Sequence, residues 1–358
     1  MTSMPDDPPV AIASVLVDID VLRDSLTEAF ATVGCASEEA SLITDALLQA
    51  ELCEVPTHGL FRVPGYLDGF ASGRYKPAAD VRVVHRGPAS VLIDADNALG
   101  YWPAWLALEE AVTIATEFGV GLAGVRNSNE LGRAAYYVEA AAARGFVSMI
   151  CANTRPLLGA PGATFATHGN NPLAYSAPWP DAPLFDAAWT PRSGGEIARR
   201  RLLGLPLLAE WGYRDELGRP TTDPAAATLG VMPAVGGAKG FGIAILVDLL
   251  AGVLTGAANG PAVPLDNSGV GAFVIVLGPD VFGDSSTLSE QLGEAARAVR
   301  SSGGRWPGDR SHAARASNLR NHAVSVPKAV LDRAVKSIRR SAPSAASRLE
   351  VCQPQAAT

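Results

Sequence analysis

Hydrophobic residues recur at intervals of three and four over much of this chain, which is the spacing of one face of a helix. Two such patterns fill residues 15–52, and a third continues to Gly69 or Gly73. Further helices are predicted over 102–118, 130–144, 197–203, 240–254, 287–301 and 326–340. Helices therefore account for much of the predicted structure.

Short β-branched runs bounded by turn residues predict strands between these helices, over 81–85, 90–94, 121–125, 146–152 and 273–277. Because strands and helices alternate between residues 90 and 152, we expect parallel pairing in a layered α/β domain. Residues 154–183 are rich in Gly, Pro and Asn and are predicted to be mostly loop. The Ala-, Ser- and Pro-rich segment after Ser341 is expected to be disordered.

Composition indicates a soluble globular protein: of 358 residues, 48% are hydrophobic and 18% are charged. The net charge of −7 argues against binding to a nucleic-acid backbone. The longest apolar run, 241–253, contains Asp248 and two glycines and is too short to span a bilayer. An acidic, Pro-rich start without a signal-peptide pattern favours the cytoplasm. Four scattered cysteines predict neither a disulfide framework nor a metal site.

One of only five histidines, His58, stands four residues before Arg62 and eight before Tyr66. Read as a helix, this segment places all three side chains on one face. An imidazole beside a fixed cation and a phenol could protonate a carbonyl whose neighbouring carboxylate is held by the arginine. An ordinary amphipathic helix with a surface arginine explains the spacing equally well.

Two glycine-rich stretches, 127–132 and 236–242, stand where a helix is predicted to begin. Free backbone N–H groups and the helix dipole favour an anion at such a place, and Lys239 adds a positive charge to the second stretch. Neither stretch has the spacing of a dinucleotide fingerprint or a P-loop. A simple tight turn remains an equal alternative for both.

Several short motifs, taken in order, resemble one family. They are Thr57-His58-Gly59-Leu60-Phe61-Arg62, then Asn127-Ser128 with Gly132, Asn153-Thr154, Gly169-Asn170-Asn171-Pro172, Thr221-Thr222-Asp223-Pro224, Gly236-Gly237-Ala238-Lys239-Gly240 and Pro307-Gly308-Asp309-Arg310. The chain resembles the malate/L-lactate dehydrogenase family, whose members include 2,3-diketogulonate reductase, ureidoglycolate dehydrogenase, sulfolactate dehydrogenase and piperideine-2-carboxylate reductase. The resemblance runs from about Val15 to Leu331.

The resemblance implies an α/β protein with a mixed-sheet NAD(P)-binding core that is not a Rossmann fold. We expect an N-terminal helical region over 1–78 that carries His58 and Arg62, the cofactor-binding core over 79–270, C-terminal elements over 271–340 packed on it, and a tail over 341–358. The family also implies a homodimer with the active site near the subunit boundary. The cofactor would be NADH or NADPH, and the substrate a small molecule that bears a carboxylate.

Roles follow from the resemblance by position. His58 would donate the proton and Arg62 would hold the substrate carboxylate, with Thr57, Tyr66 and Asp223 near the substrate. Cofactor contacts would come from Ser128, Gly132, Asn153, Asn171, Asp186, Trp189, Thr190, Lys239, Gly240, Gly308, Asp309 and Arg310. No metal is implied.

Two positions depart from the family pattern. Glu130 replaces a second histidine that serves some members as acid/base, and Trp189 places an indole in the expected cofactor region. A glutamate would repel a substrate carboxylate and favour a cationic amine or iminium. The changes point to an imine or an unusual 2-oxo acid as substrate. They also leave open an alternative, a family scaffold that binds a nucleotide or small molecule or catalyses a step without redox chemistry.

Overall fold

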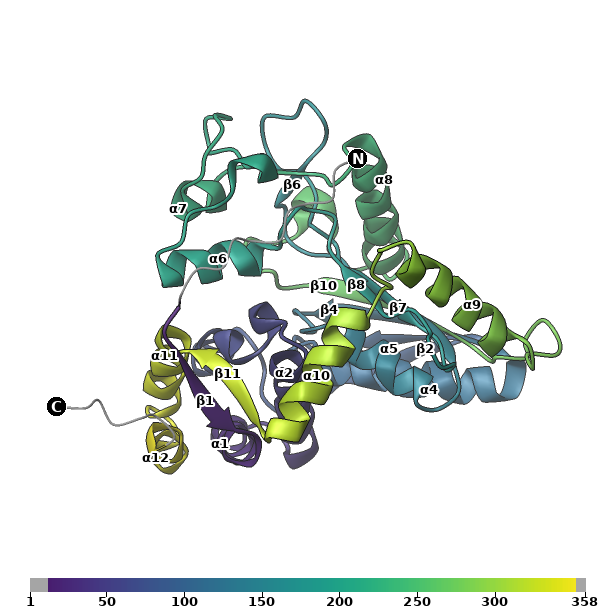
Figure 1. The fold of residues 1–358 in the computed structure, drawn as a ribbon, viewed down its shortest axis with the longest axis horizontal. Coiled ribbons are helices and arrows are strands. Elements are labelled where there is room, and N and C mark those ends of the chain that lie inside the picture. Colours follow the sequence, from purple (N-terminus) through teal and green to yellow (C-terminus); the bar gives the residue numbers. More distant parts are fainter. Residues whose placement is uncertain (1–11, 352–358) are drawn as a thin grey trace.

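A seven-stranded mixed sheet forms the centre of the computed structural model, which describes residues 12–351 (Figure 1). Its strands lie in the order β2 (Arg82–Arg86), β3 (Ser90–Asp94), β4 (Val120–Ser128), β10 (Val270–Leu277), β5 (Val147–Ala152), β7 (Leu173–Ser176) and β8 (Phe185–Ala187). Only β3 and β4 pair in parallel, and every other neighbouring pair is antiparallel. The sheet is therefore mixed and does not have the parallel order of a Rossmann fold, as expected.

The parallel pairing predicted between residues 90 and 152 is half right. Helix α4 (Tyr101–Phe118) connects β3 to β4, which are parallel neighbours. Helix α5 (Ala135–Ala142) connects β4 to β5, but β10 lies between these two strands and pairs antiparallel with both. Strand β10 comes from more than a hundred residues later, so local periodicity carries no sign of the insertion.

The two ends of the described chain share one hydrophobic core with the helices that precede the sheet. This core joins β1 (Ser14–Asp18), α1 (Ile19–Thr32), α2 (Ser37–Leu52) and α3 (Val63–Ala71) to β11 (Ala323–Pro327), α11 (Lys328–Ile338) and α12 (Pro343–Val351). Strands β1 and β11 pair antiparallel along their full lengths and lie side by side in Figure 1.

This arrangement corrects three expectations. Residues 14–18 form a strand where helix was predicted from Val15, and β11 occupies the predicted helical start at Val326. Residues 343–351 form helix α12, so the predicted disorder is wrong for them. Residues 352–358 of the expected tail lie outside the described part of the chain.

A third group of elements follows β5. It contains β6 (Leu158–Gly159) paired with β9 (Met232–Pro233), helix α6 (Gly194–Leu203), helix α7 (Pro224–Thr228) and a small core around Trp211. Helix α8 (Ala238–Val247) then continues into a π-helical segment, η4 (Asp248–Val253). Two helices, α9 (Leu288–Ser301) and α10 (Asp309–Asn321), lie between β10 and β11 along the chain.

The structure adds elements that the sequence pattern does not predict, because β7 lies in the segment expected to be mostly loop and α10 in a segment without a predicted element. No helix in residues 12–351 is long and apolar enough to cross a membrane. The cysteines at 35, 53 and 151 are buried and free, in accord with the absence of a disulfide framework among the described residues.

Candidate active site

The segment that carries His58 and Arg62 is not the continuous helix that their spacing suggests. Two short 3-10 turns, η1 (Pro56–His58) and η2 (Leu60–Arg62), precede α3, and Gly59 joins them in an extended conformation. Pro56 begins the first turn and Pro64 stands at the start of α3, where its missing N–H is tolerated. His58, Arg62 and Tyr66 still converge, because the turns and the helix fold around one acidic residue, Glu130.

His58 is partly buried, and its Nδ1 lies 3.0 Å from the Thr57 hydroxyl. Burial, together with the positive charge of Arg62, lowers the pKa of His58 to about 3, although the Glu130 carboxylate acts in the opposite direction. The imidazole is therefore neutral at pH 7 in the site as it stands. With so low a pKa the imidazole is a weak base until a further negative charge in the site raises that pKa.

Arg62 is only partly engaged by its neighbours. One terminal nitrogen, Nη1, lies 3.6 Å from Glu130 Oε2, while the buried Nε has no hydrogen-bond partner within the described part of the chain. The other terminal nitrogen, Nη2, lies next to Gly195, where an added Cβ would be 3.4 Å away. Among the described residues the Nε–Nη2 edge of the guanidinium thus makes no hydrogen bond, and this is an edge that can bind a carboxylate through two hydrogen bonds.

Glu130 lies in the loop between β4 and α5, since α5 begins at Ala135 and not at the predicted position. Tyr66 donates a hydrogen bond of 2.5 Å to Glu130 Oε1, and the Tyr66 hydroxyl is 3.2 Å from that of Tyr101. Burial alone would raise the pKa of Glu130, but Arg62 and the Tyr66 hydrogen bond outweigh it and lower that pKa. The carboxylate is therefore ionised and partly balances Arg62.

The predicted cofactor residues around Trp189 and Lys239 form one neighbourhood. The backbone N–H of Trp189 donates to Asn170 O at 2.9 Å, and the backbone carbonyl of Trp189 accepts from Val235 N at 3.0 Å. These bonds tie the loop after β8 to the loop before α8. Lys239 is exposed at the start of α8. Gly240 has no room for a side chain, because a Cβ there would collide with the Val235 carbonyl.

Two predicted cofactor residues use their amides inside the fold. Asn153 bonds to Asp248, Ala258 O and Gly271 N, while Asn171 bonds to Thr154 N and Ala244 O. These contacts give both side chains a structural task in the absence of a ligand. Their part in cofactor binding stays a prediction.

Four more predicted residues also have clear local reasons for their identity. Ser128 is buried at the end of β4, and Gly132 combines a positive φ of 75° with a position where a Cβ would strike the Tyr101 ring. Thr190 is buried and donates to Arg192 O, and Asp223 caps the N-terminus of α7. Any direct ligand contact by these four residues remains a prediction.

Gly308, Asp309 and Arg310 belong to the start of α10 and not to a loop. Asp309 accepts from Arg300 at 2.7 Å and lines a cavity of about 310 Å³ whose walls include two indoles, Trp179 and Trp306. Asp186, in β8, accepts a hydrogen bond at Oδ2 from Ala135 N at 2.9 Å. The site residues are therefore spread over two linked regions, one around His58 and one toward this cavity.

Sequence reasoning overlooks three residues beside the site. Arg133 is buried and lies within 3.9 Å of both Glu139 and Asp186, and Tyr101 extends the Tyr66 hydrogen bond inward. Glu51, at the end of α2, bonds to the backbone between the two 3-10 turns. Arg133 follows Gly132 directly, so the motif marks its position, but nothing local signals the other two.

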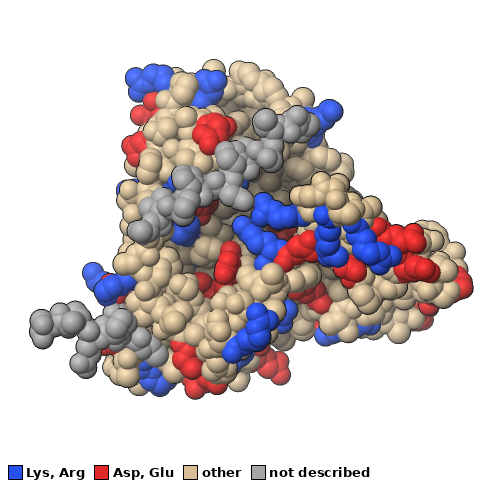
Figure 2. All heavy atoms as spheres, in the orientation of Figure 1, with Lys and Arg blue, Asp and Glu red and all other residues tan. Residues whose placement is uncertain are grey.

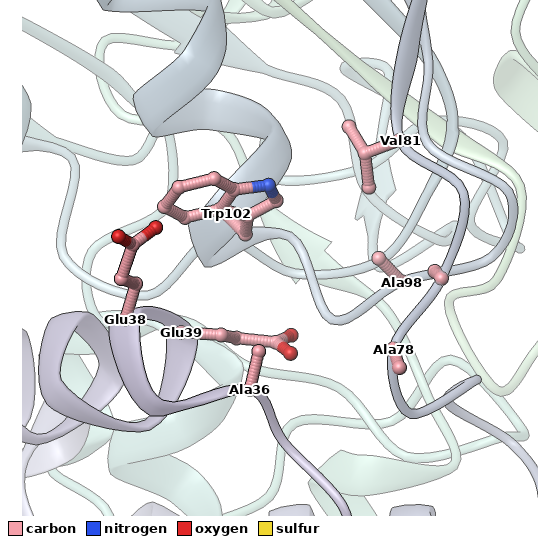
Figure 3. A pocket seen from close by; sticks show the side chains of 8 residues that line it. Ala36, Glu38, Glu39, Ala78, Val81, Ala98 and Trp102 are labelled. Atoms are coloured by element: carbon pink, nitrogen blue, oxygen red, sulfur yellow. The ribbon is translucent and has the colours of Figure 1, made fainter.

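A second cavity, of about 140 Å³, is lined by Glu38, Glu39 and Trp102 and contains none of the predicted site residues (Figure 3). On the face shown in Figure 2, basic side chains lie among acidic ones and form no broad positive surface.

Comparison with known proteins gives a consistent result. The profile of the malate/L-lactate dehydrogenase family matches residues 17–334. The (2R)-3-sulfolactate dehydrogenase (NADP(+)) of Chromohalobacter salexigens is 31% identical over 87% of this chain and 95% of its own length. The ureidoglycolate dehydrogenase (NAD(+)) of Escherichia coli K12 is 28% identical over 78% of this chain and 81% of its own. The crystal structure of delta1-piperideine-2-carboxylate reductase from Pseudomonas syringae pvar. tomato superposes with a TM-score of 0.81 at 28% identity and covers 90% of this chain and 99% of that one.

Proposed function

This chain belongs to the malate/L-lactate dehydrogenase family, and from that premise we propose that it moves a hydride between NAD(P)H and a carbon next to a carboxylate. The match over residues 17–334 confirms the resemblance seen in the motifs, so the chain is an NAD(P)-dependent oxidoreductase. The substrate would be a 2-oxo acid, the corresponding 2-hydroxy acid, or a cyclic imino acid. The alternative without redox chemistry has no support among these relatives, which are named as dehydrogenases and a reductase.

The observation that carries this proposal is the Nε–Nη2 edge of Arg62 beside His58, which is unpaired among the described residues. A buried guanidinium nitrogen without a partner is costly, and a substrate carboxylate would satisfy it. Bidentate binding at this edge would orient the reacting carbon, so that binding the substrate also places it in the geometry needed for hydride transfer. Because Nη1 faces Glu130, the arginine can hold the substrate without giving up that neighbour.

His58 would move the proton. In the oxidative direction, the neutral imidazole accepts the hydroxyl proton while the C–H bond gives up its hydride, and the ionised Glu130 stabilises the imidazolium that results. In the reductive direction, the alkoxide formed from a ketone must receive a proton from that imidazolium. An anionic substrate would raise the pKa of His58, because its negative charge offsets the positive charge of Arg62.

The residues around Trp189 and α8 are suited to hold a dinucleotide. The left-handed backbone at Gly236 and Gly237 leads into the positive end of α8, and the exposed Lys239 adds a cation for a phosphate. The cavity of about 310 Å³ is lined by charged side chains as well as by Trp179 and Trp306, and either indole could stack on an adenine ring. When bound, the nicotinamide supplies the hydride chemistry, and the protein supplies orientation and charge.

Glu130 points to the finer identity of the substrate. Reduction of a protonated imine needs only the hydride, since its nitrogen already carries the proton and the product is a neutral amine. A neutral His58 and an ionised Glu130 suit such a cationic centre better than a ketone. We therefore favour a cyclic imino acid as substrate, with an unusual 2-oxo acid as the second choice.

The test combines NADH and NADPH with a panel of 2-oxo acids and cyclic imino acids, and follows absorbance of the reduced cofactor. We expect turnover of a cyclic imino acid. His58→Ala should abolish turnover only of substrates to which a proton must be delivered. Arg62→Ala should abolish turnover of every carboxylate substrate. Glu130→His should shift preference toward oxo acids, and an unchanged profile would reject the role of Glu130. Failure of both cofactors to quench tryptophan fluorescence would favour the non-redox alternative.

We also propose a homodimer. Helix α8 and segment η4 carry an exposed apolar stripe at the helical spacing of Leu246, Leu249 and Val253, which are 43%, 51% and 54% exposed. Contact between two copies would cover these side chains. Because the first turn of α8 carries Lys239, such a contact would lie on the same helix as part of the proposed cofactor site.

A further inference from the structure

Glu51 is a buried carboxyl group that the proposed chemistry does not use. It stands in the last turn of α2, is 6% exposed, and accepts a hydrogen bond of 2.6 Å from Leu60 N. Leu60 begins the second 3-10 turn, which ends at Arg62. The Glu51 carboxyl therefore holds the backbone at the start of the turn that carries Arg62, the residue proposed to bind the substrate carboxylate.

Gly59 shows how closely the backbone approaches this carboxyl. An added Cβ at Gly59 would collide with the Glu51 carboxyl and would lie only 2.8 Å from its Cγ. The backbone between His58 and Leu60 therefore lies directly against the Glu51 carboxyl, and Leu60 is nine residues after Glu51 in the chain. Glycine at this position allows the contact, and Glu51 fills the space where any side chain would have to go.

Few charged side chains act on the Glu51 carboxyl. Burial raises the pKa of Glu51 to about 7, while the Leu60 N–H and, more weakly, Arg199 on α6 act to lower it. Arg199 is itself bonded to Glu196 on the same helix. Glu51 forms no ion pair with any residue in 12–351, so its backbone hydrogen bond is its main specific interaction there.

We propose that Glu51 is a positioning residue: by holding the Gly59–Leu60 backbone, it sets the relative placement of His58 and Arg62. The turns on either side depend on the same link, since His58 N donates to Val55 O and Arg62 N donates to Gly59 O. Without the Glu51 acceptor, the Gly59–Leu60 link loses its anchor and the two functional side chains move independently. This inference rests on the proposed function, because it assigns Glu51 no chemistry of its own.

The test compares Glu51→Gln, which keeps an oxygen acceptor, with Glu51→Leu, which fills the space without one. We expect kcat within about threefold of wild type for Glu51→Gln and at least a tenfold loss for Glu51→Leu, since small misplacements of a catalytic group have large effects. KM for the carboxylate substrate should also rise in Glu51→Leu, whereas the Kd of the cofactor, read from tryptophan quenching, should stay unchanged. Equal kcat in the two folded variants would overturn the proposal.

A second pair of variants approaches the same contact from the other side and does not depend on the fold tolerating leucine at 51. Gly59→Ala should displace the carboxyl and lower kcat at least tenfold, while Gly65→Ala, where a Cβ meets nothing within 4 Å, should have no effect. Equal behaviour of these two variants would also overturn the proposal. Arg62→Ala separates the two levels: if it retains full turnover of the carboxylate substrate, the proposed function itself is wrong, whatever Glu51 does.

Discussion

The charge of His58 is the most consequential single property of the site. An imidazole in water has a pKa near 6.5, but burial and Arg62 lower the value for His58 to about 3. Glu130 limits this effect and would stabilise the protonated form during turnover. The resting site thus combines a neutral imidazole, a partly neutralised arginine and an ionised carboxylate.

The depressed pKa of His58 predicts a pH-dependent stability. Between about pH 3 and pH 6.5 the unfolded chain binds a proton at this position and the folded chain does not, so acidification through that window favours unfolding. We expect His58→Gln to gain stability relative to wild type by about 2 kcal/mol when the pH falls from 7.5 to 4.5. Urea denaturation of both proteins at the two pH values measures this, and a constant difference would show that His58 titrates normally.

Arg62→Lys tests whether the guanidinium fork, and not only its charge, binds the substrate. The ammonium keeps the positive charge but cannot present two parallel donors to a carboxylate. We expect KM for the carboxylate substrate to rise at least tenfold, with a smaller change in kcat. Arg74→Lys is a suitable control, because Arg74 is an arginine outside the proposed substrate contacts whose guanidinium bonds to Asp266 O. Similar KM values in Arg62→Lys and wild type would contradict the bidentate role.

Spacing in the sequence identifies His58, Arg62 and Tyr66 as a group, although the reason it offers is wrong. The expected helix face does not exist, and the three side chains meet through Glu130, which comes from a loop more than sixty residues later. Glu51 and Tyr101 remain hidden for the same reason, since their contacts are set by tertiary packing. Local spacing can group residues along one segment, but it gives no sign of the residues that support them from elsewhere in the chain.

Among the secondary structure elements, those with strong periodicity are predicted well and those with weak or mixed patterns are not. Helices α2, α4 and α9 follow their apolar spacing. Strand β1 alternates exposed and buried positions, but its five residues run directly into α1, and the apolar spacing fits both structures. Helix α10 is largely polar with Ala314 as its only buried residue, so it gives little hydrophobic signal.

The turn that begins α8 can be tested with two neighbouring glycines. A methyl group at Gly240 would collide with the Val235 carbonyl, whereas one at Gly242 meets nothing within 4 Å. We expect Gly240→Ala to weaken NAD(P)H binding at least tenfold by distorting the loop that carries Lys239. Gly242→Ala should bind normally and stabilise the helix by about 0.5–1 kcal/mol. Tryptophan quenching and thermal melts of the pair measure both effects, and equal cofactor affinity would remove this loop from the proposed site.

The fold closes by bringing its two ends together, and α12 takes part in that closure. Leu349 is completely buried with Ala345 and Ala346, whereas Val351 on the same helix is 85% exposed. We expect Leu349→Ala to destabilise the protein by about 2–4 kcal/mol, because it leaves a cavity in the core shared with α1. Val351→Ala should change stability by less than about 0.5 kcal/mol. Similar unfolding midpoints for the two variants would mean that α12 does not pack as described.

The exposed stripe on α8 and η4 gives a prediction for the assembled protein. A large charged side chain at the centre of an apolar contact between two copies must be desolvated, so Leu249→Arg should convert the proposed homodimer to monomers. Phe118→Arg is the matched control, because Phe118 is 54% exposed at the end of α4 and Leu249 is 51% exposed. Light scattering coupled to size exclusion should give a dimer mass for wild type and Phe118→Arg and a monomer mass for Leu249→Arg. Because the stripe lies on the helix that carries Lys239 in its first turn, the monomer should also bind NAD(P)H more weakly. A wild type that is monomeric at every concentration would instead require another explanation for the stripe.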